Sequence, residues 1–81
     1  MSSTVSKAQA TRSHILRQAA IVFNRQGFAG TSMSDLMQAT GLQKGGVYNH
    51  FKSKDELALA TYDAVLAELN SRYRQVLRRD R

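Results

Sequence analysis

Three neighbouring residues, Gln43, Lys44 and Gly45, carry chemistry suited to reading the bases of a nucleic acid. A Lys ammonium donates to guanine O6 and N7, and a Gln amide pairs with adenine N6 and N7. A Gly allows the backbone to approach a ligand surface closely. Apolar Val47 and Phe51 lie four residues apart and are expected to face a core. That orientation leaves Gln43, Lys44 and Gly45 at the exposed end of a short helix.

Hydroxyl, imidazole and ammonium donors flank this segment. Tyr48, His50 and Lys54 follow it, and Ser32 opens the helix predicted before it. Donors beside a base-reading helix usually clamp phosphates, and the free N–H groups at a helix start also attract them. Other interpretations stay open, because Tyr48 and His50 would also suit the edge of a core. Lys54, like Lys52, would also suit an ordinary solvated surface.

Basic residues are concentrated in the same part of the chain. The 81 residues carry 12 Lys and Arg against 6 Asp and Glu, a formal net charge of +6. Residues 1–54 hold seven of the bases and one of the acids, whereas residues 55–81 hold five of each, so the whole excess lies before residue 55. A basic face attracts phosphate polyanions, although a solvated surface that is merely basic would have the same composition.

Four helices are expected to position these residues. Apolar periodicity predicts helices over about 8–26, 33–40, 43–49 and from 54 to near 79. Capping boxes predict where three of them begin: Ser6 with Gln9, Ser32 with Asp35, and Ser53 with Glu56. Gly27 should end the first, and Gly41 should end the second in a left-handed conformation. The second and third helices then form a helix-turn-helix, whose second helix is shaped to enter the DNA major groove.

The predicted fold is therefore all-α, a three-helix bundle that contains a helix-turn-helix and is followed by a long fourth helix. The predicted organisation has three parts: a flexible N-terminal arm over residues 1–7, a helix-turn-helix domain over 8–53, and a linker helix over 54–81.

The last predicted helix carries an apolar repeat with heptad spacing, 3-4-3-4-3. Such a seam requires a partner helix. The first part of this helix can pack on the first helix, but its last turns extend beyond a three-helix core, since each residue adds about 1.5 Å. The partner is a missing part of a longer protein, the same helix folded back, or a second copy. The repeat consists of Leu59, Tyr62, Leu66, Leu69, Tyr73 and Val76.

Several function classes are disfavoured. The chain has no Cys, and His14 and His50 share no metal-ligand spacing, so neither a thiol nucleophile nor a metal or other cofactor is expected. The residue order of a phosphate-binding loop is absent around Lys44. No apolar run approaches the roughly 18 residues of a membrane span, and the start lacks a signal-peptide pattern. The chain is expected to be cytoplasmic, non-enzymatic and not bound to a membrane.

The stretch from Thr11 to Leu57 resembles the N-terminal DNA-binding domain of TetR-family transcriptional regulators. Three local motifs carry the resemblance in the right order and at the right spacing. They are Gly27-Phe28-x-x-Thr31-Ser32, the turn Gly41-Leu42, and Tyr48-Asn49-His50-Phe51-x-x-Lys54. Two positions depart from the family pattern, because Met37 stands where a small Ala is frequent and Gly46 where a Thr or Ser is common.

The resemblance implies sequence-specific binding to double-stranded DNA at a palindromic operator, most often as a repressor. It implies a homodimer in the full-length protein, and a small-molecule effector bound by a C-terminal domain that this chain lacks. A protein-interaction module that uses the heptad repeat is the alternative function. Base contacts would come from Ser34, Gln43, Lys44 and Gly45, and phosphate contacts from Ser32, Tyr48, His50 and Lys54.

Overall fold

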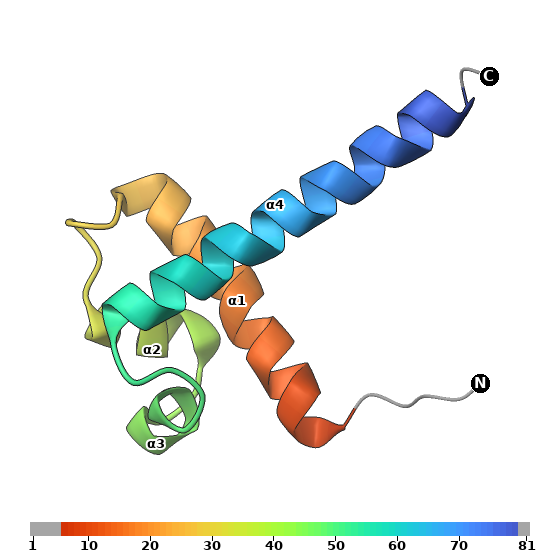
Figure 1. Ribbon diagram of the computed structural model, residues 1–81. Coiled ribbons are helices and arrows are strands. Elements are labelled where there is room, and N and C mark those ends of the chain that lie inside the picture. The colour runs from red at the N-terminus through yellow and green to blue at the C-terminus, as the bar shows by residue number, and fades with distance from the viewer. Residues whose placement is uncertain (1–5, 80–81) are drawn as a thin grey trace.

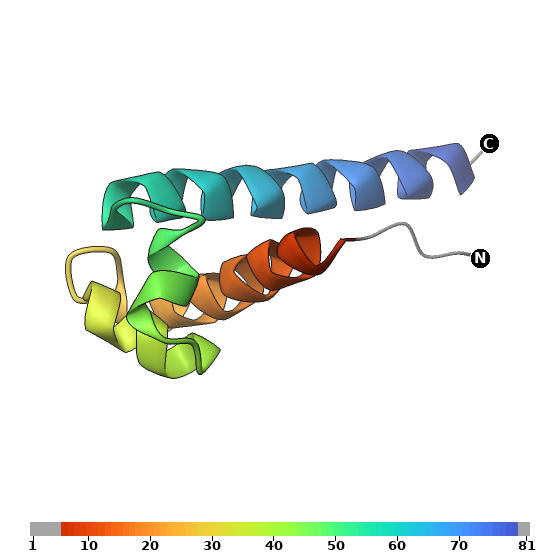
Figure 2. The same ribbon diagram turned by 90° about the horizontal axis from the view of Figure 1, so that it is seen from below.

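Four helices make up the computed structural model, which describes residues 6–79. In Figure 1, α4 crosses over α1, and α2 and α3 lie together near the N-terminal end of α4. Figure 2 shows α4 as one layer, with α1 beneath it and α2 and α3 at one end. The predicted all-α fold with a long last helix is confirmed. The helices are α1 Lys7–Gln26, α2 Met33–Thr40, α3 Lys44–Tyr48 and α4 Lys54–Arg79.

The first two helices begin at the serines that the sequence predicts. The Ser6 hydroxyl accepts from the Gln9 amide N–H at 3.1 Å, and the Gln9 side chain accepts from the Ser6 N–H at 3.2 Å. Ser32 and Asp35 exchange the same two bonds at 3.0 Å each. These reciprocal bonds satisfy backbone donors that have no partner inside the helix.

The predicted arm over residues 1–7 overlaps the start of α1. Residues 1–5 lie outside the described residues, Ser6 is the N-cap of α1, and Lys7 is already its first helical residue. The last two residues, 80–81, also lie outside the described part.

Glycines end α1 and α2 as predicted. Gly27 has φ +78° and its N–H donates to the Phe23 carbonyl at 2.7 Å. Gly41 has φ +75° and ψ +9°, the left-handed conformation, and its N–H donates to the Met37 carbonyl at 3.0 Å. A residue with a Cβ is strained in this region of φ. Gly41 therefore permits the tight turn that leads from α2 into α3.

The start of α4 differs from the predicted capping box in one detail. The Ser53 hydroxyl accepts from the Glu56 N–H at 3.1 Å, as predicted. The Glu56 carboxylate, however, accepts from the N–H of Lys52 at 2.7 Å rather than from that of Ser53. The carboxylate therefore bonds to the loop between α3 and α4 at Lys52, one residue before the N-cap Ser53.

A small apolar core lies where α1 meets α2 and α4. The apolar faces of α1, α2 and the start of α4 converge there, together with the α3 region. Burying one such side chain contributes about 1.5–3 kcal/mol. The prediction that Val47 and Phe51 face the core is confirmed. The largest fully buried side chains are Phe51, Ile15, Leu36, Leu57, Val47 and Thr31.

The first part of α4 packs on α1, but not through the heptad repeat. Its buried residues are Leu57, Ala58 and Thr61. Leu59 and Tyr62, the first two residues of the repeat, are 67% and 54% exposed. The repeat therefore lies on a neighbouring face of α4 and stays exposed along its whole length. None of the helices in residues 6–79 combines the length and hydrophobicity needed to cross a membrane.

Candidate nucleic-acid interface

The short helix α3 turns one side to the core and the other to solvent. Val47 is fully buried, while Gln43, Lys44 and Gly45 are exposed. Gln43 is the N-cap rather than the first helical residue, so α3 is one residue shorter at each end than predicted. The Gln43 carbonyl accepts from the Gly46 N–H at 2.8 Å, but its side chain makes no capping bond. That side chain is free to bond an external partner.

The two consecutive glycines of α3 have different surroundings. A Cβ at Gly46 would lie 3.2 Å from the Cβ of Leu42, which is tighter than most such contacts. A Cβ at Gly45 would meet no atom within 4 Å, and Gly45 does not have a positive φ. Packing against Leu42 therefore explains Gly46. Nothing inside the described residues explains Gly45, although a helical Gly costs about 1 kcal/mol relative to Ala.

Tyr48 and His50 lie half-buried at the edge of the core. The Lys44 ammonium lies 6.0 Å from the centre of the Tyr48 ring, at the outer limit of a cation–π contact. The His50 ring lies beside the buried ring of Phe51, with the centroids 6.4 Å apart. The Lys52 ammonium donates to the Tyr48 carbonyl at 2.9 Å and so helps to close the C-terminal end of α3.

Lys54 contacts the loop between α1 and α2. Its ammonium donates to the Phe28 carbonyl at 2.8 Å and lies 4.1 Å from the centre of the Phe28 ring. The Phe28 ring in turn stacks on Phe23 of α1, with the centroids 6.0 Å apart. One of the three ammonium donors is used by this carbonyl. Lys54 thus joins the first turn of α4 to the loop that leads into α2, and two donors are left for an external acceptor.

The start of α2 presents Ser32 and Ser34 to solvent. The Ser32 hydroxyl accepts the capping bond from Asp35, so its own proton can still be donated outward. The Asp35 carboxylate also accepts from the Gln26 side chain at 3.2 Å. The Ser32 backbone N–H, and then the Gln26 amide, lower the pKa of Asp35 below its usual value, because both bonds favour the ionised carboxylate.

Two residues of α1, which the sequence analysis did not assign to the site, hold the segments on either side of α3. The His14 Nε2 lies 2.8 Å from the Thr40 carbonyl at the end of α2. The Arg12 guanidinium lies 4.8 Å from the centre of the Phe51 ring, just beyond α3. Neither contact has a signal in the sequence, since the partners are 26 and 39 positions apart. Arg12 and His14 therefore contact the residues that lie just before and just after α3.

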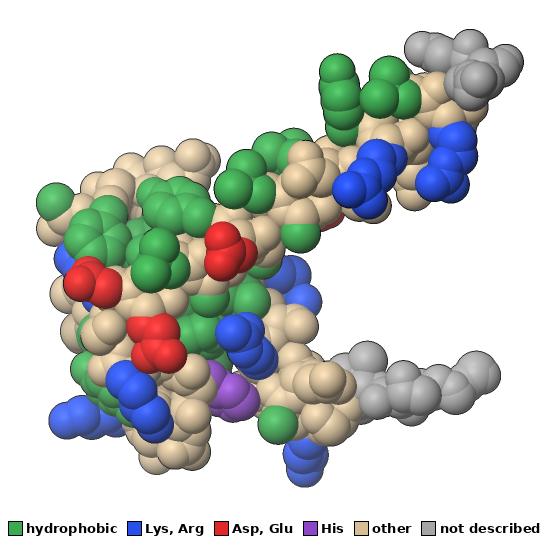
Figure 3. Space-filling model, viewed as in Figure 1, with side chains coloured by type: hydrophobic (Ala, Val, Ile, Leu, Met, Phe, Trp, Pro, Cys, Tyr) green, Lys and Arg blue, Asp and Glu red, His purple; other side chains and the backbone are tan. Residues whose placement is uncertain are grey.

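Lys and Arg side chains lie at this end of the molecule, with Asp and Glu side chains beside them (Figure 3). In Figure 3, Lys and Arg side chains project at the lower left, over the region of α2 and α3, and a His side chain lies beside them. The structure thus brings an exposed helix end (Gln43, Lys44 and Gly45) together with basic and hydroxyl donors. This arrangement suits a polyanion whose grooves admit a helix. The structure places Ser34 on the exposed first turn of the neighbouring α2.

Comparison with known proteins agrees with this geometry. The family described as bacterial regulatory proteins, tetR family, matches residues 15–61. The HTH-type transcriptional regulator AcrR of Shigella flexneri is 43% identical over 54 residues, which cover 67% of this chain and 25% of that protein. The HTH-type transcriptional repressor KstR2 of Mycolicibacterium smegmatis is 32% identical over 74 residues, covering 91% of this chain and 36% of that protein.

A third relative, the HTH-type transcriptional regulator TtgR of Pseudomonas putida, is 36% identical over 62 residues, covering 76% of this chain and 30% of that protein. The chain thus spans only 25–36% of the length of these three relatives. No solved structure shows a significant match to it. The predicted resemblance is confirmed: the chain belongs to the tetR family of bacterial regulatory proteins, which are transcriptional regulators rather than enzymes, and contains the family's helix-turn-helix DNA-binding domain.

Proposed function

We propose that this domain reads the base sequence of double-stranded DNA by inserting the N-terminal end of α3 into the major groove. The observation that carries the proposal is the exposed group Gln43, Lys44 and Gly45. The two side chains match adenine and guanine edges. The space beside Gly45 is open on the protein side, so a bare backbone there suits a close approach of DNA. Ser34, on the exposed first turn of α2, adds a further base contact.

Phosphate contacts from both sides would fix the register of α3. Ser32 offers a hydroxyl proton at the start of α2. Tyr48 is the last residue of α3 and His50 follows the helix; both are half-buried, so their rings are held while their polar atoms can reach the surface. Lys54 keeps two ammonium donors beside its bond to Phe28. Such contacts set position and orientation and leave base discrimination to α3.

The regulator to which this domain belongs is proposed to be a cytoplasmic, dimeric repressor. A dimer reads a palindrome, with the two half-sites about one helical turn apart. The relatives are roughly two and a half times the length of this chain, which leaves room in such a protein for a domain that binds a small-molecule effector. A repressor role is supported by the name of one relative, the transcriptional repressor KstR2.

The test is a selection from randomised duplex DNA at moderate salt, read by sequencing. The protein would be compared with a Lys44→Ala/Tyr48→Ala variant and with Arg74→Ala, a control on the exposed outer part of α4. Circular dichroism would show that all three are folded. We expect an enriched motif with the protein and with Arg74→Ala, and none with the double variant.

The alternative outcomes separate the parts of the proposal. Binding without any enriched motif would contradict base reading by α3 and leave a basic surface that holds phosphates. An enriched motif that is still found with the double variant would mean that a different surface of the protein reads the bases. An enriched half-site without its symmetric counterpart would contradict the dimeric mode of reading for this chain.

A further inference from the structure

Phe28 contacts the Lys54 ammonium with both its backbone and its ring. The carbonyl accepts from the ammonium at 2.8 Å, and the ring centre lies 4.1 Å from the same nitrogen. That distance is well inside the roughly 6 Å over which a ring attracts a cation. In the part of the chain that the structure describes, Lys52 has only the Tyr48 carbonyl, and Lys44 has only the Tyr48 ring at 6.0 Å. Lys54 is therefore the most closely held of these three lysines.

Both contacts hold the ammonium of Lys54 without neutralising it. A carbonyl and an aromatic ring carry no net charge, so the positive charge of the side chain remains. A carboxylate partner would instead compete with a phosphate for the same cation. Among the described residues the one ion pair joins Arg72 to Glu68, so no carboxylate competes for Lys54 there. With two of its three donors unused, the ammonium is held in place and is still able to bind an anion.

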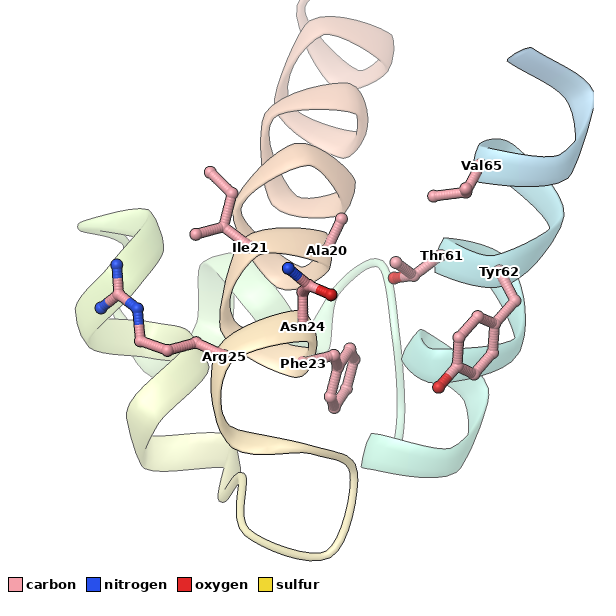
Figure 4. A pocket seen from close by; sticks show the side chains of 8 residues that line it. All are labelled: Ala20, Ile21, Phe23, Asn24, Arg25, Thr61, Tyr62 and Val65. Carbon is pink, nitrogen blue, oxygen red and sulfur yellow. The ribbon is translucent and has the colours of Figure 1, made fainter. Parts of the chain in front are cut away.

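Phe23 of α1 supports the Phe28 ring. The two rings stack with their centroids 6.0 Å apart, and Phe23 is only 6% exposed. Figure 4 shows the Phe23 ring pointing from α1 into the groove between α1 and α4, where Thr61 and Tyr62 face it. Phe28 itself is 38% exposed, so it contacts the core and still has surface for the ammonium. The position of the Lys54 ammonium is thereby linked to the packing of α1 against α4.

The backbone at Phe28 is held by its neighbours in the loop between α1 and α2. Its carbonyl also accepts from the Thr31 N–H at 3.2 Å, and the Thr31 hydroxyl donates to the Gly27 carbonyl at 2.7 Å. The Gln26 amide donates to the Gly30 carbonyl at 2.9 Å. The carbonyl that receives the ammonium therefore has a defined position before any ligand is bound.

A lysine that is already held loses less freedom when it binds a ligand. Its flexible stem carries substantial rotamer entropy, and ordering such a side chain at an interface weakens binding by about two- to tenfold. If the ordering takes place during folding, binding no longer carries this cost. An aliphatic side chain of similar size has no negative face, so it would not hold the ammonium as the Phe28 ring does.

We propose that Phe28 is a positioning residue for DNA binding, which holds the Lys54 ammonium where it meets a phosphate. The inference rests on the proposed function, in which Lys54 contacts a phosphate, and it adds a residue that acts on DNA only through Lys54. Phe28 stands in one of the three motifs that carry the family resemblance, Gly27-Phe28-x-x-Thr31-Ser32. This role requires an aromatic ring at the second position of that motif.

The first test measures the contact itself, without DNA. The ε-CH₂ protons of Lys54 lie close to the Phe28 ring, whose ring current should shift them upfield in the NMR spectrum. Phe28→Leu keeps an apolar side chain and should return them to the ordinary lysine position, while Phe28→Tyr should keep the shift. Lys52, which contacts no ring within the described residues, supplies the reference. Unshifted Lys54 protons in the unmodified protein would overturn the inference whatever the DNA measurements give.

The second test measures affinity for duplex DNA against salt concentration by fluorescence anisotropy. Phe28→Leu should weaken binding by about two- to tenfold on every sequence. The slope of log affinity against log salt should stay the same, because the charge of Lys54 still reaches the phosphate, whereas Lys54→Ala should lower the slope by about one. Phe28→Tyr should bind as the unmodified protein does. Circular dichroism would show that each variant is folded.

A double-mutant cycle separates the positioning of Lys54 from a loss of loop structure. In the Lys54→Ala background, Phe28→Leu should have no further effect on affinity, because the ammonium that it holds is absent. In the Ser32→Gly background the full loss should remain, since Ser32 would meet its phosphate from the start of α2. Glycine is chosen there because it removes the hydroxyl and still serves as an N-cap.

The other outcomes separate the inference from the function on which it rests. If Lys54→Ala leaves affinity and slope unchanged, the phosphate contact of Lys54 is wrong, and the role of Phe28 with it. If Lys54→Ala lowers the slope but Phe28→Leu does not weaken binding, or weakens it equally in the Lys54→Ala background, only the role of Phe28 is wrong. A loss that disappears in Ser32→Gly would show that the ring positions the start of α2 instead of Lys54.

Discussion

The inner and outer sides of residues 42–54 obey different constraints. On the inner side, the identities of Val47 and Phe51 follow from burial, and that of Gly46 from the nearness of Leu42. On the outer side, Lys44 and Gly45 have no comparable partner in the described residues. Residue types that the fold does not require indicate what lies outside the fold. The inner side should therefore control stability, and the outer side should control DNA recognition.

The strongest test of this comparison is Phe51→Ala. Removing a fully buried Phe should lower the free energy of unfolding by about 3–5 kcal/mol, a large share of the roughly 5–15 kcal/mol typical of a domain. Urea unfolding followed by circular dichroism measures this loss. Asn49→Ala, at an exposed neighbouring position, should change stability by no more than about 0.5 kcal/mol. Equal losses in both variants would remove the distinction between the two sides.

Lys44→Ala tests the outer side. It should weaken binding at the selected operator by about 1–3 kcal/mol and relax base preference there, with the unfolding free energy unchanged. Fluorescence anisotropy with operator and scrambled duplexes separates the two effects. An equal loss on scrambled DNA would make Lys44 a phosphate contact rather than a base contact.

Gly45→Ala and Gly46→Ala compare the two sides at adjacent positions. Gly45→Ala should raise the free energy of unfolding by about 1 kcal/mol through helix propensity, while its Cβ weakens DNA binding. Gly46→Ala should raise the free energy of unfolding by less, because its Cβ would lie only 3.2 Å from the Cβ of Leu42. Thermal unfolding and operator affinity would be measured for both. Unchanged affinity in Gly45→Ala would mean that the backbone does not approach DNA at this position.

Lys54 lies between the two sides, because its ammonium contacts Phe28 and also has donors for a phosphate. Lys54→Ala should weaken binding to all sequences alike and lower the slope of log affinity against log salt by about one. Arg74→Ala, on the outer part of α4, should leave the slope unchanged. If the slope is the same for Lys54→Ala and the unmodified protein, Lys54 does not contact a phosphate and only holds the loop at Phe28.

A substitution of Asp35 should have the smallest effect on stability. Asp35 is an exception to the division between the two sides, since its carboxylate is solvent-accessible and yet stabilises the fold. Its pKa is lowered in the folded state by the Ser32 N–H and the Gln26 amide. The stabilisation is therefore complete above the unfolded pKa, about 3.9, and is lost as pH falls through the lower folded value. Thermal unfolding from pH 5 to pH 2 should show a shallower decline for Asp35→Asn. An identical decline would show that these bonds do not contribute.

Much of the fold follows from local sequence signals. The predicted range 33–40 coincides with α2, and the other predicted bounds lie within one residue of those observed. Serine caps and the two terminal glycines act within a few residues, so their effect can be read along the chain. Heptad spacing likewise identified the six residues of the apolar repeat in α4, but it did not predict that all six would stay exposed.

The contacts that join distant segments were not predictable in the same way. Lys54 was expected to be a phosphate ligand or a solvated charge, and its bond to Phe28 crosses 26 positions. The contact between His14 and Thr40 has the same separation. Such pairs depend on how helices cross in space, which no local pattern specifies. The different surroundings of Gly45 and Gly46 likewise became visible only once Leu42 was placed.

Two side chains of α1 support α3 from either side. His14 contacts the Thr40 carbonyl before α3, and Arg12 contacts the Phe51 ring after it. The side chains that would read DNA take no part in these supports. Natural selection can therefore alter Gln43 or Lys44 one at a time without bringing the domain below the stability threshold that limits most substitutions. Operator preference in descendants of this chain should consequently diverge much faster than the architecture that displays it.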